Sequence, residues 1–184
     1  CVYNMIEYLL MRREWIILLI ILVIAGFFRL YNLDITPPGL HPNEAVNANN
    51  ALEALDTKYF KLFYSDNTGR EGLYINFMAF ILKVFGNEIW VIRLTSAILG
   101  ILTVLGLYFL TKELFNWQIA SISAFLLSVS FWHVNFSRIG FSGIFVPLLL
   151  VFTFYFLWRG FKNLNNWDFL WAGVLLGLGM YSYA

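Results

Sequence analysis

Long apolar segments separated by short polar breaks run along most of the chain. Each is close to the length of about 20 residues that a helix needs to cross a bilayer. We predict membrane-spanning helices near residues 14–30, 90–110, 117–134, 142–158 and 168–184. A cleaved signal peptide is the alternative for the first segment, but no small-residue cleavage site follows it. The predicted fold class is all-α, a polytopic membrane helical bundle.

The longest polar stretch covers residues 31–71 and follows the first predicted span. We predict that it forms an extracytoplasmic loop. Four apolar residues inside it recur with helical spacing: Ala48, Leu52, Leu55 and Tyr59. This stripe predicts a short amphipathic helix over residues 43–59, lying on the membrane surface with Pro42 in its first turn.

Residues 72–85 are apolar, but the segment is shorter than a usual span. We predict a second juxtamembrane helix in the membrane interface; the alternative is a helix that spans. The interfacial prediction places five cations on one side of the membrane: Arg12, Arg13, Lys112, Arg159 and Lys162. The positive-inside rule makes that side, and with it the N-terminus, cytoplasmic. A spanning helix would move the last three cations outside, but both arrangements keep the loop 31–71 extracytoplasmic.

The composition supports a lipid-facing surface. Of the 184 residues 60% are hydrophobic and only 12% are charged, against about 25% charged in a soluble domain. The net charge of +1 gives no basic field, so we expect no nucleic-acid partner. The single cysteine, Cys1, excludes a disulfide framework, and neither His41 nor His133 has the sequence neighbours of a metal site.

Glu44 is the first candidate for chemistry. It falls in the first turn of the predicted helix 43–59, where a helix N-terminus stabilises an anion by roughly 0.3–1 kcal/mol. An ionised carboxylate suits a general base. Acids are also enriched at helix starts without any further role, and that alternative stays open.

Three charged residues, Asp66, Arg70 and Glu71, lie just before the apolar segment 72–85. Their side chains suit the binding of a substrate hydroxyl or phosphate. The alternative is a solvated salt bridge at the membrane edge, which contributes little stability.

Three further cations, Lys83, Arg93 and Arg138, fall on the outer side of the predicted topology. Arg93 lies three residues into the apolar run that starts at Trp90, so it either snorkels to the interface or lines a polar cavity. Cations beside the loop carboxylates suit a lipid-linked phosphate substrate, because arginine binds phosphate through two parallel hydrogen bonds.

A series of short motifs now gives the chain a resemblance to a known group of membrane enzymes. The motifs are PPGLHPNEA at 37–45, GREGLY at 69–74, KVFG at 83–86, RLTSA at 93–97 and TKELF at 111–115. In order and spacing they resemble the membrane glycosyltransferases of the GT-C superfamily, in the branch of the dolichyl-phosphate-mannose–protein mannosyltransferases and the bacterial aminoarabinose transferases. We expect residues 1–184 to be the N-terminal part of a single GT-C-type transmembrane domain in a longer protein.

The resemblance implies a polyprenyl-phosphate-linked sugar as donor, used on the extracytoplasmic face. Family members carry an Asp-Glu pair early in the first outer loop, and an acid there is thought to be the catalytic base. The matching positions are Asn43 and Glu44, so an amide replaces the first acid. Arg93 matches a family arginine near the start of the following span, and Arg70 with Glu71 matches a Gly-Arg-Glu-Gly pattern of prokaryotic members.

The residues and the resemblance together predict an inverting glycosyltransferase that moves a hexosyl or pentosyl group to an unknown acceptor. Glu44 would deprotonate the acceptor, and Arg93 with Arg70 would stabilise the leaving phosphate. We expect no obligatory cofactor, a prokaryotic plasma-membrane location, and membrane lipids and the lipid-linked donor as partners. The alternatives are a transporter or flippase, and a catalytically inactive binder of lipid-linked sugar, which the amide of Asn43 keeps open.

Overall fold

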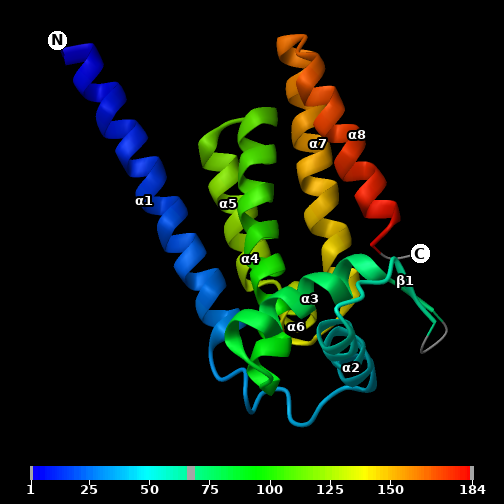
Figure 1. The fold of residues 1–184 in the computed structure, drawn as a ribbon. Helices are drawn as coiled ribbons and strands as arrows, with labels where there is room; N and C mark the ends of the chain where they lie inside the picture. Colours follow the sequence, from blue (N-terminus) through cyan, green and yellow to red (C-terminus); the bar gives the residue numbers. More distant parts are fainter. Residues whose placement is uncertain (1, 66–68, 183–184) are drawn as a thin grey trace.

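The computed structural model describes residues 2–65 and 69–182, with side chains described from residue 12 onward. Within these residues the chain forms eight α-helices, one 3-10 helix and one two-stranded hairpin (Figure 1). The helices are α1 (Val2–Leu30), α2 (Pro42–Thr57), α3 (Gly72–Phe85), α4 (Ile89–Leu114), α5 (Trp117–Val129), α6 (Phe131–Arg138), α7 (Phe145–Asn163) and α8 (Asn166–Met180). The 3-10 helix η1 (Ser142–Ile144) precedes α7, and the strands β1 (Phe63–Tyr64) and β2 (Arg70–Glu71) pair antiparallel. The predicted all-α class is confirmed.

Two segments are long and apolar enough to cross a membrane on their own, α4 and the stretch Ser142–Asn163 that joins η1 to α7. They contain the predicted spans 90–110 and 142–158, so the chain is an integral membrane protein. Helix α1 contains the predicted segment 14–30, and α8, with 15 residues, contains most of 168–184. Neither passes the same test of length and composition over the described residues, so their crossing of the membrane stays a prediction.

The predicted span 117–134 is not one continuous helix, although its two pieces together are apolar enough to be a broken span or a re-entrant loop. Helix α5 ends before Ser130, which is extended, and α6 leaves at an angle of 56°. The guanidinium of Arg29, on α1, donates to the carbonyls of Leu127 and Ser128 at 3.3 and 2.9 Å. Carbonyls at a helix end need partners from outside the helix. Arg29 supplies them, and so holds the break in a run whose apolar pattern by itself indicates a continuous helix.

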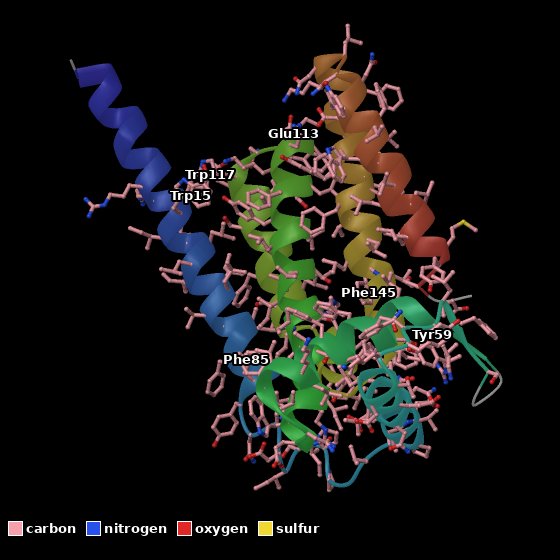
Figure 2. All side chains as sticks on the ribbon, viewed as in Figure 1. Trp15, Tyr59, Phe85, Glu113, Trp117 and Phe145 are labelled. Carbon is pink, nitrogen blue, oxygen red and sulfur yellow. The ribbon has the colours of Figure 1, made fainter. Side chains whose placement is uncertain are left out.

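Helix α3 has the bounds predicted for the interfacial helix 72–85, and its 14 residues are few for a span. It lies across the end of the bundle from which α4 and α7 extend (Figure 1). At the opposite end, where Figure 2 labels Glu113, Lys112 bonds to Glu14 and Lys162 to Glu113. The cationic ends of α1, α4 and α7 therefore lie together, away from α2 and α3, as the interfacial arrangement predicts.

Helix α2 confirms a helix in the loop, and Ala48, Leu52 and Leu55 of the predicted stripe pack in or against its buried core. The buried positions are Glu44, Asn47, Ala48, Asn50, Ala51 and Ala54. Tyr59, the last residue of the predicted stripe, lies beyond the helix and is exposed. The three alanines join a core with Tyr74 and Met78 of α3. Small side chains let the two helices approach closely, and the larger Leu52 and Leu55 of the predicted stripe pack, partly buried, against the same core.

Helix α4 belongs to both apolar cores of the bundle. One core joins α4 to α2, α3 and the start of α7, and the other joins α4 to α1 and α5. The first core contains a polar bond, because the hydroxyls of Tyr74 and Ser96 lie 2.7 Å apart. Burial raises the pKa of Tyr74, and this hydrogen bond acts in the opposite direction. The hydroxyl therefore stays protonated and ties α3 to α4, directly beneath the site described next.

Candidate active site

The first turn of α2 is organised by its own sequence. His41 is the N-cap and Pro42 occupies the first turn. The His41 side chain accepts a hydrogen bond from the backbone N–H of Asn43, and the Glu44 carboxylate accepts one from the backbone N–H of His41 at 2.9 Å. This is a capping box with histidine in the place that serine or threonine usually takes. It fixes where the helix begins, and so sets the positions of Asn43 and Glu44.

Glu44 forms a buried ion pair with Arg93. The Nε atom of Arg93 lies 3.1 Å from Oε1 of Glu44, and the two side chains are only 1% and 2% exposed. The remaining guanidinium nitrogens of Arg93 donate to the carbonyls of Leu33 and Gly39. Arg93 therefore links α4 to the start of α2 and to the segment that precedes it, and its nitrogens are all used within the protein.

The backbone of Gly140, between α6 and η1, contacts α2 directly. Its N–H donates to Oε1 of Glu44 at 2.9 Å, and its carbonyl accepts from the Asn47 amide at 3.0 Å. A Cβ atom at position 140 would lie 3.0 Å from Cγ of Glu44 and 3.2 Å from Ile92. Glycine allows this close approach, so both carboxylate oxygens of Glu44 are bound inside the protein.

Asn43 and Arg70 form the accessible part of the site. The Nη2 atom of Arg70 donates to Oδ1 of Asn43 at 3.0 Å, and Nη1 lies 3.5 Å from Oγ of Ser142. Both Asn43 and Arg70 are half-buried. The hairpin of β1 and β2, the first turn of α2 and η1 thus meet around one arginine that still reaches solvent.

The other predicted site residues lie in different surroundings. Arg138 donates to the carbonyls of Phe28, Tyr31 and Thr36 at 2.8, 2.8 and 2.9 Å, so it braces the segment after α1. Lys83 is exposed on α3, and Glu71 is half-buried next to Arg70 in the chain. Asp66 lies outside the described residues. Of the predicted set, the structure brings together Asn43, Glu44, Arg70 and Arg93.

Sequence reasoning missed three members of this assembly, Asn47, Gly140 and Ser142. Asn47 falls one helical turn after Asn43, and that spacing was the available signal for a shared face. Gly140 and Ser142 carry no comparable signal, because their contacts come from the fold of a distant segment. Within the described residues, no three of His, Cys, Asp and Glu gather in an arrangement that suits a metal ion.

Fold and site define a polytopic membrane protein whose polar centre lies where juxtamembrane helices meet the ends of the bundle helices. The family model for dolichyl-phosphate-mannose-protein mannosyltransferase matches residues 73–184, and the chain belongs to this family. The predicted GT-C resemblance is thereby confirmed. Arg93 and Arg138 lie inside the matched region, whereas Asn43, Glu44 and Arg70 precede it.

The fold is also similar to a solved structure, the crystal structure of the Archaeoglobus fulgidus oligosaccharyltransferase in the apo form. The TM-score is 0.65 and the sequence identity 19%, over 92% of this chain and 23% of that chain. At this identity the likeness concerns the fold, and the chain spans less than a quarter of that protein. A comparison with curated proteins gave no match.

Proposed function

We propose that the chain is part of a glycosyltransferase that moves a sugar from a polyprenyl-phosphate-linked donor to an acceptor at the membrane surface. Family membership supports the activity class. The observation that carries the proposal is the half-buried guanidinium of Arg70, fixed between Asn43 and Ser142. An arginine held at the end of a membrane bundle, with part of its surface open, suits a lipid-linked phosphate.

The proposed site faces the extracytoplasmic side. The ends of α4 and α7 that carry Lys112 and Lys162, and the part of α1 around Glu14 that Lys112 contacts, lie opposite α2 and α3. The positive-inside rule assigns the cationic end to the cytoplasm. The N-terminus is then cytoplasmic, and a plasma-membrane location in a prokaryote remains part of the proposal.

In the proposed reaction, an acceptor oxygen attacks the anomeric carbon from the face opposite the phosphate and inverts that centre. The bond between the anomeric carbon and the phosphate oxygen breaks, and its electron pair stays on the phosphate. Arg70 stabilises the charge that develops there. Two arginine hydrogen bonds suit the phosphate monoester that leaves, which is why we propose no obligatory metal ion.

The acceptor proton requires a separate account. Asn43 cannot take it, because an amide is not a useful base near neutral pH. The prediction that Glu44 is the base remains untested, but three hydrogen bonds occupy its oxygens and favour a positioning role. We propose that the proton leaves for water after the new bond forms, when the bonded acceptor oxygen has become strongly acidic.

Transfer from radiolabelled polyprenyl-phosphate sugars, measured with the full-length protein in membranes, tests this proposal. Arg70→Ala should lower kcat/KM by about 10²–10³-fold, and Arg12→Ala, which removes an exposed arginine at the opposite end, should not. Asn43→Asp should raise the rate by about 10²-fold, because it adds a base beside the acceptor.

The outcomes separate the alternatives. Transfer by neither the parent nor Asn43→Asp, with every donor tried, would remove the support for an enzyme. Transfer by Asn43→Asp alone would identify the parent as an inactive binder of lipid-linked sugar. Unchanged transfer in Arg70→Ala would exclude the phosphate role of that residue.

A further inference from the structure

We infer that the chain has a second lipid site, separate from Arg70, that binds the ammonium headgroup of a membrane phospholipid through Asp34 and Trp90. The site is a cavity of about 340 Å³ between the segment that follows α1 and the first turns of α4. Its lining residues are Leu30, Asn32, Leu33, Asp34, Trp90 and Leu94. A volume near 300 Å³ is at the lower end for ligand pockets and suits a headgroup rather than a whole lipid.

Hydrogen bonds from two arginines hold the backbone segment that forms the polar side of the cavity. Arg93 donates to the carbonyl of Leu33, and Arg138 donates to those of Tyr31 and Thr36. Asn32 adopts a left-handed conformation with φ of 56°. Both guanidinium groups bind backbone oxygens of this segment, so the shape of the cavity exists before any ligand arrives.

Asp34 is the one acid in this lining, and it is exposed. Within residues 2–65 and 69–182 it has no hydrogen bond or ion pair. An unpaired carboxylate near the end of a membrane helix attracts a cation, and a primary ammonium group can both neutralise it and donate hydrogen bonds to it. A divalent ion would need several oxygen ligands, and a single carboxylate does not supply them.

Trp90 also lines the cavity, and its residue type suits the level of the lipid headgroups. It lies in the first turn of α4, and its ring packs edge-on against Phe85 with centroids 6.3 Å apart. Tryptophan is enriched at the headgroup level of membranes, and its ring face attracts ammonium groups within about 6 Å. The cavity thus combines a carboxylate and an indole at the level where lipid headgroups lie.

The apolar side chains at the rim of the cavity favour a lipid over a free amine as the ligand. Leu30 and Leu94 line its apolar part, and Leu94 lies one helical turn from Trp90 along α4, towards the middle of the span. Phe28 and Leu30 at the end of α1 are exposed apolar side chains. A phospholipid places its ammonium beside Asp34 while its acyl chains cover these side chains, whereas a soluble amine would leave them uncovered.

The test uses the full-length protein in nanodiscs that contain equal amounts of phosphatidylethanolamine and phosphatidylglycerol. Native mass spectrometry measures which lipid stays bound as detergent is added. The parent should retain phosphatidylethanolamine in preference, and Asp34→Asn should reduce that preference about fivefold. Trp90→Leu should also reduce it, while Asp56→Asn, an exposed acid on α2, should not.

Four results would overturn the inference. The first is equal retention of the two lipids by the parent, and the second is an unchanged preference in Asp34→Asn. The third is an equal loss of the preference in Asp34→Asn and Asp56→Asn, which would indicate a general effect of charge. Displacement of the bound lipid by soluble glycerophosphoethanolamine would refute the requirement for acyl chains. Because the readout is bound lipid, failure here leaves the transferase proposal unaffected.

Discussion

Replacement of Glu44 by glutamine separates a catalytic base from a positioning residue. In the structure the carboxylate accepts three hydrogen bonds, from Arg93, from the N–H of Gly140 and from the N–H of His41. Glutamine keeps the shape, but its NH₂ group would face one of these donors. The variant therefore leaves Arg93 as a buried charge without an anion, and it leaves one backbone N–H without an acceptor.

The expected loss of unfolding free energy follows from the burial of the ion pair between Glu44 and Arg93. Removal of one partner from a buried ion pair costs about 3–5 kcal/mol, because the other charge stays buried and uncompensated. Glu44 and Arg93 are only 2% and 1% exposed in their side chains, so screening by solvent does not reduce this value much. We expect Glu44→Gln to lower the free energy of unfolding by about 3 kcal/mol or more.

Denaturant unfolding of the purified full-length protein in detergent measures this change. Glu53→Gln, on the exposed face of the same helix, is the matched control and should change stability by less than about 1 kcal/mol. The double variant Glu44→Gln, Arg93→Met should lose less than the sum of the two single variants, because no unpaired charge remains.

One combination of results would refute the positioning role. If Glu44→Gln unfolds like the parent but no longer transfers sugar, the carboxylate acts on the substrate and the original base prediction holds. If the variant is destabilised and its kcat falls only in proportion to the folded fraction, Glu44 positions the first turn of α2.

Three further perturbations test other parts of the structure. Gly72→Ala places a Cβ 2.2 Å from the carbonyl oxygen of Lys61, so it should destabilise the protein by about 1–3 kcal/mol in the same unfolding assay, whereas Gly173→Ala, with open space around it, should not. Arg138→Ala removes three carbonyl contacts, so the amides of residues 31–40 should exchange hydrogen at least tenfold faster; unchanged exchange would contradict the bracing role. Transfer should survive EDTA, and a loss that Mg²⁺ or Mn²⁺ restores would contradict a metal-free reaction.

The sequence predicts the helices well where a single physical effect dominates. Apolar runs the length of a bilayer must form helices, because lipid offers no partner for backbone polar groups. The bounds of α3 follow from an equally local signal, since Gly72 begins the apolar run and Gly86 ends it with φ of 94°. Pro42 and Glu44 likewise indicate the start of α2 from local chemistry alone.

Prediction from the sequence fails where a residue far away along the chain determines the local structure. The break between α5 and α6 depends on Arg29, about a hundred residues earlier in the chain. The burial of the polar residues Glu44 and Asn47 on α2 depends on Arg93 and Gly140, which lie far along the chain. In each case a contact with a distant part of the chain determines the local structure.

The candidate site likewise has features that the sequence predicts and features that only the fold determines. The sequence by itself determined which residues carry charge and that they precede or follow membrane helices, and the family resemblance implies that Asn43 stands in the place of an acid. Only the tertiary structure decided that Arg93 and Arg138 bind backbone carbonyls while Arg70 stays half-buried beside Asn43. The physical reason is that a guanidinium group serves equally well as a structural donor or as a phosphate ligand, and the choice depends on which acceptors the fold places within 3 Å.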